Sequence, residues 1–523
     1  MVEINGHSLT YQDLVRVARL GESVVISAEG VQAITASRQR LEDIFETNRP
    51  VYGINTGFGI FAEYPIPSEA SAKLSRNLIL SHAVGTGEPL PKEVVRAAML
   101  VRANTLAKGY SGVRLEVVQT LIDMLNKGVT PVIPSQGSLG SSGDLCPLSH
   151  LALVFTTDEE NREEDSGWAE YGDMIMTGKA AMETAGIPRV ILGPKEGLAL
   201  NNGATFSAAI TALAIADAEY LLKVADASLA LSLEAMMGCL AAFDARIHEV
   251  RGHDGQKQVA ENIRAMTAGS TLLDASGRVQ DAYSLRCAPQ VQGPVLETVQ
   301  FIKRIVEREL NAATDNPLIF EPKDVLSGGN FHGEPIGLAA DYLSISMSEL
   351  GAISERRIFR MTDGKLNFGL PPMLVDSQEA AGLNSGMMIP QYTAASLVLE
   401  NQTLSAPDSV HSLPTSAEQE DHNANSMTAA RHARQVVANV CHVLAIELYT
   451  AARAIDLRIR QVPRGRLGKG TKMVYKKIRR EIPYRAGDIW WGPEIDRVRK
   501  MIEERIFFPV EQVDHLQNID KDN

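Results

Sequence analysis

The feature that most constrains the fold of this chain is a set of long segments in which apolar residues recur at helical spacing. One of them covers residues 205–243, TFSAAITALAIADAEYLLKVADASLALSLEAMMGCLAAF, and is apolar and alanine-rich along most of its length. Its most apolar part, residues 227–243, is short for a membrane span and contains Glu234, so burial in a large core or in a subunit interface explains it best. Further long helices are expected over residues 92–109, 114–128, 294–317, 337–363 and 430–459.

Patterns that predict β-strands are rare and short. The clearest are SVVIS at 23–27 and RVILG at 189–193. We therefore expect a mainly α protein with a central bundle of long helices. The loops between the predicted helices are rich in Gly, Asn, Ser and Pro, and the unusual side chains gather there.

Composition excludes several classes of partner. The chain has 523 residues and a formal net charge of −13, which argues against a general affinity for nucleic acid or an anionic membrane. The basic run at 458–481 is interpreted as a solvated face or terminal helix rather than a binding patch. The first residues lack the basic and apolar regions of a signal peptide, and we expect a soluble, cytoplasmic protein.

The cysteines and a cluster of acidic residues are the candidate metal ligands of this chain. Four cysteines are scattered without paired spacing, so we expect no disulfide framework and no zinc site. Glu418, Glu420, Asp421 and His422 lie within five residues, but no HExxH or paired-histidine motif accompanies them. We expect no metal, although a metal-dependent lyase built on Glu420 and His422 stays open as an alternative.

Two loops carry candidate catalytic side chains. The loop VYGINTGFG at 51–59 places Tyr52 among glycines, and it lacks the Lys-Ser/Thr sequence of a phosphate-binding loop. In QDAYSLRCAPQ, Tyr283 and Arg286 are spaced by about one helical turn. Arginine suits a carboxylate, and tyrosine can relay a proton. A buried arginine satisfied by backbone carbonyls explains the same residues.

The segment GSLGSSGDLCPLSH at 137–150 is the most specific motif in the chain, and it has no GxSxG nucleophile pattern. It resembles the prosthetic-group segment of the aromatic amino acid ammonia-lyase and aminomutase family. Other segments resemble the same family in the expected order: YGINTGFG, RNLILSHAVGTGEPL, KEGLALNNG, QDAYSLRCAPQ, TDNPL, GGNFHGEP and SAEQEDHNANSM. The resemblance covers most of the chain, from residue 51 to residue 427.

The resemblance implies a built-in prosthetic group, 4-methylidene-imidazol-5-one (MIO), formed from Ser141-Ser142-Gly143, and no external cofactor. The unhindered nitrogen of Gly143 attacks the carbonyl carbon of residue 141, and Ser142 loses its hydroxyl to leave an exocyclic methylene. Family members usually have Ala where this chain has Ser141, and cyclisation should survive that change. A helical scaffold that kept the fold and lost the ring is the non-enzymatic alternative.

Further roles follow from the resemblance alone. Tyr52 matches the residue that removes the β-proton, and Arg286 matches the clamp for the substrate carboxylate. Other matches concern the prosthetic group and its surroundings: Asn202 and Tyr283 position the group and the substrate amine, Phe331 forms an aromatic wall, and Gln280 contacts the substrate or the group. The reaction implied is elimination of ammonia from an aromatic amino acid to give an α,β-unsaturated acid.

The substrate is predicted from two positions. Ser81-His82 resembles the ring-binding pair of the histidine-specific members, although a tyrosine aminomutase can carry the same pair. Glu420 resembles the glutamate that meets the imidazole. Counted backward from Asn425-Ser426-Met427, however, the segment has the phenylalanine-specific length, which places His422 at the selectivity position. Histidine is the first expectation. Phenylalanine or tyrosine deamination, a 2,3-aminomutase and a modified histidine substrate stay open.

The family resemblance also implies an assembly. Members are homotetramers whose active sites combine residues of three subunits, and the long Ala- and Leu-rich helices agree with extensive subunit contacts. We expect the N-terminal region 1–200 to hold the MIO, residues 201–460 to form the central bundle and residues 461–523 to form a C-terminal helical tail. A small aromatic amino acid is the expected ligand, with neither nucleic acid nor membrane as a partner.

Overall fold

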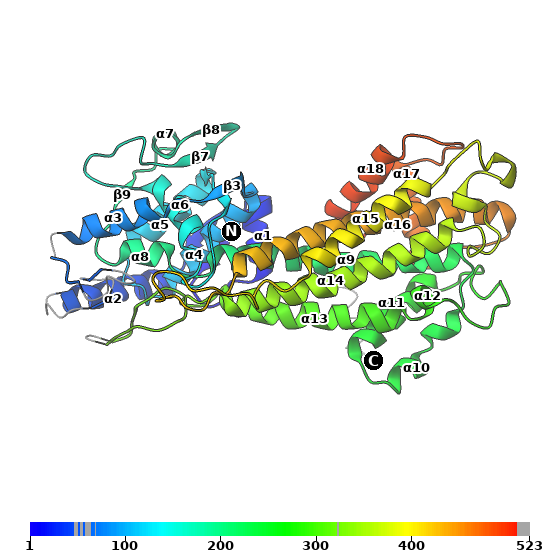
Figure 1. Ribbon diagram of the computed structural model, residues 1–523, viewed down its shortest axis with the longest axis horizontal. Coiled ribbons are helices and arrows are strands. Elements are labelled where there is room, and N and C mark those ends of the chain that lie inside the picture. Colours follow the sequence, from blue (N-terminus) through cyan, green and yellow to red (C-terminus); the bar gives the residue numbers. More distant parts are fainter. Residues whose placement is uncertain (46–50, 53–55, 58–63, 68–69, 322–323, 510–523) are drawn as a thin grey trace. The chain divides into compact units, whose positions relative to one another are not determined.

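The structure is a computed structural model that describes residues 1–45, 51–52, 56–57, 64–67, 70–321 and 324–509. Most of them lie in helices (Figure 1), which confirms the mainly α prediction. The helices are α1 (Tyr11–Leu20), α2 (Ala28–Phe45), α3 (Ser71–His82), α4 (Lys92–Ala107), α5 (Leu115–Lys127), α6 (Leu145–Phe155), α7 (Gly178–Thr184), α8 (Glu196–Asn201), α9 (Thr205–Ala235), α10 (Ala245–Glu249), α11 (Asp254–Thr267), α12 (Tyr283–Arg286), α13 (Ala288–Glu309), α14 (Glu334–Thr362), α15 (Met388–Leu404), α16 (Ser426–Gln461), α17 (Lys469–Glu481) and α18 (Trp491–Glu503).

The strands are short. They are β1 (Val2–Ile4), β2 (Val24–Ile26), β3 (Thr86–Pro89), β4 (Thr130–Pro131), β5 (Pro134–Gln136), β6 (Thr156–Thr157), β7 (Trp168–Tyr171), β8 (Met174–Thr177), β9 (Val190–Ile191), β10 (Leu318–Ile319) and β11 (Val325–Leu326). Strands β1 and β2 pair in parallel, as do β6 and β9, whereas β3–β5, β4–β7–β8 and β10–β11 are antiparallel. Both strand patterns seen in the sequence are strands here, as β2 and β9.

Local sequence signals set several helix ends. Thr10 and Asp13 form a capping box at the start of α1, in which each side chain accepts from the other residue's backbone N–H. Helix α1 ends at Gly21 and α5 ends at Gly128, both in the left-handed conformation that glycine adopts without strain. The predicted helix over 205–243 is α9 as far as Ala235, and a 3-10 helix covers Leu240–Phe243.

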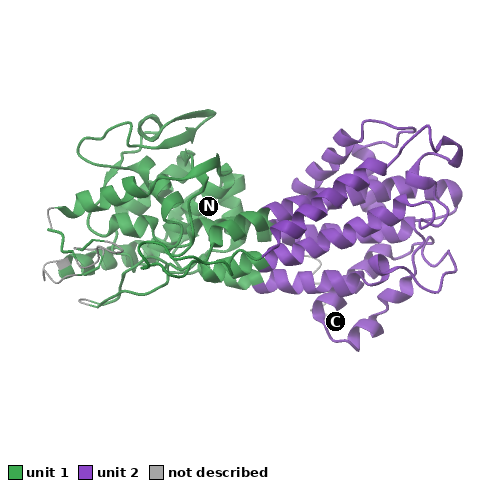
Figure 2. Cartoon of the chain, viewed as in Figure 1, with its two compact units in different colours: residues 1–216, 302–341, 407–434 green, residues 217–301, 342–406, 435–523 purple. Residues whose placement is uncertain are grey.

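The described chain forms two compact units, shown in different colours in Figure 2. Unit 1 comprises residues 1–216, 302–341 and 407–434, and unit 2 comprises residues 217–301, 342–406 and 435–523. Each unit therefore takes segments from distant parts of the sequence. Four of the five divisions fall inside α9, α13, α14 and α16, and the one between residues 406 and 407 falls between α15 and α16. The predicted contiguous regions 1–200, 201–460 and 461–523 stay a prediction.

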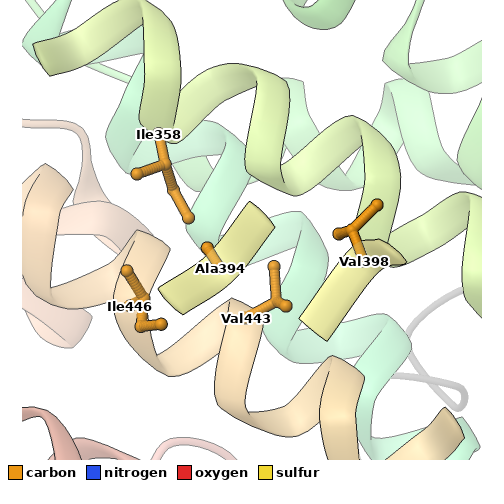
Figure 3. Close-up of a cluster of buried hydrophobic side chains, with 5 residues drawn as sticks. All are labelled: Ile358, Ala394, Val398, Val443 and Ile446. Carbon is orange, nitrogen blue, oxygen red and sulfur yellow. The ribbon is translucent and has the colours of Figure 1, made fainter. Parts of the chain in front are cut away.

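The core of unit 2 is packed from aliphatic side chains of α14, α15 and α16. Figure 3 shows one such cluster, in which Ile358 from α14 meets a set from the other two helices: Ala394, Val398, Val443 and Ile446. Such small and branched side chains let helices approach closely, and their burial supplies most of the stability of a bundle.

Among the described residues, one helix, α16, has the length and the apolar composition needed to cross a membrane. However, 83% of its most apolar window is buried inside the structure. A core helix of a large bundle has these same properties, and α16 packs as one in the cluster of Figure 3.

Candidate active site

The segment 137–144 precedes α6 in unit 1 and runs beside residues 202–203, the link between α8 and α9. Gly143 and Gly203 form a parallel β-bridge, in which the Gly203 N–H donates to the Ser142 carbonyl oxygen at 3.2 Å and the Asp144 N–H to the Gly203 carbonyl at 2.9 Å. Gly143 has a φ of +77°. The two backbones approach so closely that position 143 requires glycine.

The carbonyl oxygen of Ser142 accepts a second hydrogen bond, from Asn202 Nδ2 at 2.7 Å. Asn202 is buried, and its Oδ1 has no hydrogen-bond partner. In the ring implied by the sequence, this carbonyl oxygen would be retained as the ring carbonyl. Two N–H groups already aimed at that oxygen therefore fit the prosthetic group, since donors of this kind stabilise negative charge on a carbonyl oxygen.

Asp144, directly after the tripeptide, anchors the segment to Ser138 and to Ser207 of α9. Its carboxylate accepts from Ser138 Oγ at 2.8 Å and from both Ser207 Oγ and the Ser207 N–H at 2.9 Å. Complete burial raises the pKa of Asp144, and these donors oppose that shift. The side chain thus ties the tripeptide to the first turn of α9.

Several helices begin at residues that contact this segment or the side chains that hold it. Helix α6 starts at Leu145, and the first turn of α9 binds Asp144. The hydroxyl of Ser426, the first residue of α16, lies 2.9 Å from Ser207 Oγ. The N–H of Gly333, just before α14, donates to the Gly140 carbonyl at 2.8 Å. Helix N-termini carry partial positive charge, so their grouping favours negative charge developing at the tripeptide.

Two buried ionisable side chains, Arg102 and Glu309, lie near the helices that flank Asn202 and near Asp144. Arg102 in α4 donates to the Ala199 carbonyl at 3.2 Å and to Thr205 Oγ1, joining α4 to both helices that flank Asn202. Burial lowers its pKa only to about 10, so it stays a cation at neutral pH. Burial, with Asp144 nearby, raises the pKa of Glu309 to about 7.

Glu420 faces the hydroxyls of the tripeptide. Ser141 Oγ donates to Glu420 Oε2 at 2.7 Å, and Ser142 Oγ donates to Glu420 Oε1 at 2.8 Å. Thr415 and Glu420 exchange backbone hydrogen bonds across a tight turn, in which Ser416, Ala417 and Glu418 all have positive φ. This folded turn places the carboxylate over the segment that is predicted to become the MIO.

His82, the last residue of α3, lies in the electrostatic reach of Glu420. Burial lowers the pKa of His82, and the hydrogen bond to the Leu78 backbone and the Glu420 carboxylate offset only part of that shift, so the imidazole is neutral at pH 7. Its Nδ1 is 2.9 Å from the hydroxyl of Ser81. The pair predicted to bind the substrate ring is therefore together, and His82 shares a neighbourhood with Glu420.

His422 takes a different position. Its exposed ring stacks on His332, with ring centroids 5.8 Å apart, and its carbonyl oxygen is 3.1 Å from His332 Nε2. Phe331 is half-buried and lies two residues before Gly333, whose N–H binds the tripeptide segment at Gly140. Of the two candidates for the selectivity position, Glu420 is the one whose side chain contacts Ser141 and Ser142.

Gln280, Tyr283 and Arg286 belong to unit 2, whereas the tripeptide belongs to unit 1. Gln280 is exposed, and Tyr283 is 71% exposed. Arg286 places its guanidinium 4.7 Å from the centre of the Tyr283 ring, in a cation–π contact within α12. The predicted roles of these three side chains stay predictions.

Tyr52 is half-buried and follows Val51, which packs against a cluster of Leu41, Ile44 and Ile319. Residues 53–55 and 58–59 of its predicted loop lie outside the described residues. The role of Tyr52 as a base also stays a prediction. Among the described residues, no group of three His, Cys, Asp or Glu side chains is arranged to hold a metal ion.

Several residues that build the site have no role predicted from the sequence. They are Ser138, Asp144, Gly203, Ser207 and Ser426. Ser138, Asp144, Gly203 and Ser426 lie inside the family motifs, so the motifs carried a signal for them. Ser207 gave none, because its function depends on where α9 begins in three dimensions.

Comparison with known proteins places this geometry in a family. The sequence profile described as aromatic amino acid lyase matches residues 9–480. The chain belongs to the aromatic amino acid lyase family. This confirms the family predicted from the motifs, and with it a carbon–nitrogen lyase.

Individual relatives agree along nearly the whole chain. The histidine ammonia-lyase of Caldanaerobacter subterraneus subsp. tengcongensis is 50% identical over 485 residues, which is 92% of each chain. The crystal structure of histidine ammonia-lyase from Trypanosoma cruzi matches with a TM-score of 0.87 and 39% identity, over 98% of this chain and 96% of that one. Tyrosine aminomutase from Streptomyces globisporus matches with a TM-score of 0.89 and 34% identity, over 97% of both chains.

Proposed function

We propose that this family member is an MIO-dependent ammonia-lyase that converts L-histidine to urocanate and ammonia. The observation that carries the proposal is the Glu420 carboxylate, held at 2.7 and 2.8 Å from the hydroxyls of Ser141 and Ser142. A carboxylate in this place can accept the N–H of an imidazole, and a phenyl ring offers no such donor. The 50% identity to a relative named histidine ammonia-lyase supports the same substrate.

Asn202 and Gly203 would hold the prosthetic group by donating to the Ser142 carbonyl oxygen. Asp144 would hold it by tying the tripeptide to the first turn of α9 through Ser207. When formed, MIO supplies an electron-poor alkene carbon that no ordinary side chain provides. The two N–H donors withdraw electron density through the carbonyl oxygen, and the nearby helix N-termini act in the same direction.

The remaining roles concern the substrate. Glu420 and neutral His82 bind and orient the imidazole ring, with Ser81 fixing the His82 ring through Nδ1. Arg286 binds the substrate carboxylate, and Tyr52 removes the β-proton as ammonia leaves. Tyr283, Gln280 and Phe331 complete the pocket around the amine and the aromatic ring.

We further propose a cytoplasmic homotetramer in which Gln280, Tyr283 and Arg286 reach the tripeptide of a neighbouring chain. Apolar side chains on the long helices support an assembly, since several are exposed in the single chain: Phe301, Tyr342, Ile345, Tyr392 and Leu399. Sedimentation velocity tests it, and a monomer with full activity would contradict it.

The substrate is tested by incubating the purified protein separately with L-histidine, L-phenylalanine and L-tyrosine. Ultraviolet spectra then report urocanate, cinnamate or coumarate. We expect urocanate from histidine and little product from the other two. Cinnamate or coumarate as the main product would overturn the histidine assignment, and a β-amino acid product, detected by mass spectrometry after chromatography, would show an aminomutase instead.

A further inference from the structure

Ser141 is the place where this chain departs from the usual sequence of the family motif. Its side chain is 7% exposed, and its hydroxyl hydrogen bonds to Glu420 Oε2 at 2.7 Å. An alanine there could make no such bond. The departure from the motif is therefore linked directly to the carboxylate proposed to bind the substrate.

Formation of the prosthetic group changes what holds Glu420. The Gly143 nitrogen bonds to the Ser141 carbonyl carbon, and that carbonyl oxygen leaves as water with the two amide hydrogens of Gly143 and Ser142. Ser142 then loses its Oγ hydroxyl and its α-hydrogen as a second water, which leaves the methylene. The Ser142–Glu420 hydrogen bond is lost with that hydroxyl, whereas the side chain of Ser141 is not consumed.

The other neighbours of Glu420 can replace the lost Ser142 hydrogen bond only weakly. Thr415 Oγ1 lies 3.5 Å from Glu420 Oε2, at the limit of a hydrogen bond. Burial lowers the pKa of the His82 imidazole, so His82 offers the Glu420 carboxylate no full positive charge at pH 7. The turn fixes the backbone of Glu420 through Thr415, but the three side-chain torsions of a glutamate stay free unless a donor holds the carboxylate.

We propose that Ser141 is a positioning residue for Glu420: its hydroxyl holds the carboxylate toward the imidazole of the substrate after the group has formed. This inference rests on the proposed histidine substrate. The hydroxyl holds one oxygen of the carboxylate and leaves the other, released by Ser142, to accept the imidazole N–H. Members with Ala at this position must fix their glutamate in another way or bind the ring less tightly.

The test is a double-mutant cycle on ligand binding. The variants are Ser141→Ala, Glu420→Ala and the double variant, and the probe is 3-(imidazol-4-yl)propanoate, which has no amine to react. Intact mass first establishes that each protein has lost two water molecules. By calorimetry we expect Ser141→Ala to weaken binding about 10-fold, and to weaken it by less than about twofold when Glu420 is already Ala.

Steady-state kinetics and a second probe separate positioning from a general structural effect. Ser141→Ala should raise KM for histidine by about the same factor of 10 and change kcat by less than about threefold, since the lost bond orients the ring rather than the reacting carbon. It should leave the affinity for 3-phenylpropanoate unchanged, because a phenyl ring gives the carboxylate no hydrogen.

Ser232→Ala is the matched control. Ser232 Oγ donates to a buried carboxylate, Glu447 Oε1, at 2.7 Å in unit 2, and Arg357 also binds that carboxylate. This variant removes the same kind of hydrogen bond and should lower the melting temperature without changing the affinity for either probe.

The outcomes are distinct. Wild-type protein that neither binds the imidazole probe nor deaminates histidine would overturn the proposed function and this inference with it. Wild-type protein that does both, combined with equal effects of Ser141→Ala in the two Glu420 backgrounds, would overturn the inference alone. A Ser141→Ala protein of full mass would also overturn it, because the hydroxyl would then serve ring formation.

Discussion

Gly143 and Gly203 lie so close that a Cβ atom on Gly143 would be 2.1 Å from the carbonyl carbon of Gly203. Gly203 is enclosed on its other side, where a Cβ atom would be 2.4 Å from Thr314 Oγ1 and 2.9 Å from an Arg102 guanidinium nitrogen. The backbone of the tripeptide therefore packs directly against the backbone of Gly203, which Thr314 and Arg102 confine on its other side. Such a cradle suits a ring closure that needs the peptide held in a compressed form.

We expect Gly203→Ala to prevent formation of the prosthetic group. The added methyl group has to displace Thr314 or Arg102, and the φ of +121° at this position is strained for alanine. Intact mass should show the full, unprocessed chain, and histidine turnover should be lost. A protein lighter by two waters would contradict the need for this contact.

Gly128→Ala controls for backbone strain alone. Gly128 also has a positive φ, of +82°, but a Cβ atom there would meet no atom within 4 Å. The change should cost roughly 1 kcal/mol of stability, visible as a lower melting temperature, and leave the mass and the turnover as in the wild type.

Glu420→Gln should lower kcat/KM for histidine by roughly 10- to 100-fold, since a carboxylate that accepts a hydrogen bond is replaced by a neutral amide. His422→Ala should change it by less than about threefold, because the His422 ring is exposed and stacks on His332. The two rates are compared from urocanate absorbance. If the His422 variant lost its activity while the Glu420 variant kept nearly the wild-type kcat/KM, the selectivity position would be assigned to His422.

Asn202→Ala removes the shorter of the two hydrogen bonds to the Ser142 carbonyl oxygen. Removal of a donor of this kind commonly costs a factor of about 100 to 1,000 in kcat. We expect a loss in that range for the fraction of the variant whose mass shows that it has lost two waters. An unchanged kcat in that fraction would mean that Asn202 does not stabilise the group.

Asp226 in unit 2 makes stability depend on pH. Burial raises its pKa to about 7, although Asn262 and Gln292 donate to its oxygens at 2.7 and 3.1 Å. The unfolded chain releases this proton near pH 4, so between about pH 4 and pH 7 the folded state binds more protons and its stability falls as pH rises.

Asp226→Asn removes this titration. The melting temperature of the variant minus that of the wild type should therefore increase as pH rises from 4 to 7. The altered hydrogen bonds add only a cost that does not change with pH. Calorimetric scans at matched protein concentration measure the difference. A difference that is constant with pH would contradict the assigned burial effect.

The sequence predicted local features well. The segment 430–459 was predicted as a helix because of its apolar spacing, and α16 spans Ser426–Gln461. In the structure Ser142 is hydrogen-bonded to Glu420 and to Asn202, and the roles that the motifs imply for these residues stay predictions. Such features depend on short-range spacing or on motifs that the family shares.

Other features depend on how distant segments pack, and the sequence did not predict them. Asp144 is held by Ser207, 63 residues away, and Ser207 in turn meets Ser426, 219 residues away. Ser207 does not stand out by type or spacing, and Ser426 lies in the motif SAEQEDHNANSM but carries no sign there of its contact with Ser207. The choice between Glu420 and His422 stays open from the sequence for the same reason, because it depends on how the turn that begins at Thr415 folds rather than on a count of residues.

The most direct test of the central claim is the mass of the proteolytic peptide that contains residues 134–150, taken from protein that is turning over histidine. We predict a peptide lighter than its linear sequence by two water molecules, and a peptide of full mass from an inactive Ser142→Ala variant. A linear peptide of full mass in catalytically competent wild-type protein would contradict the claim that Ser141-Ser142-Gly143 becomes the prosthetic group.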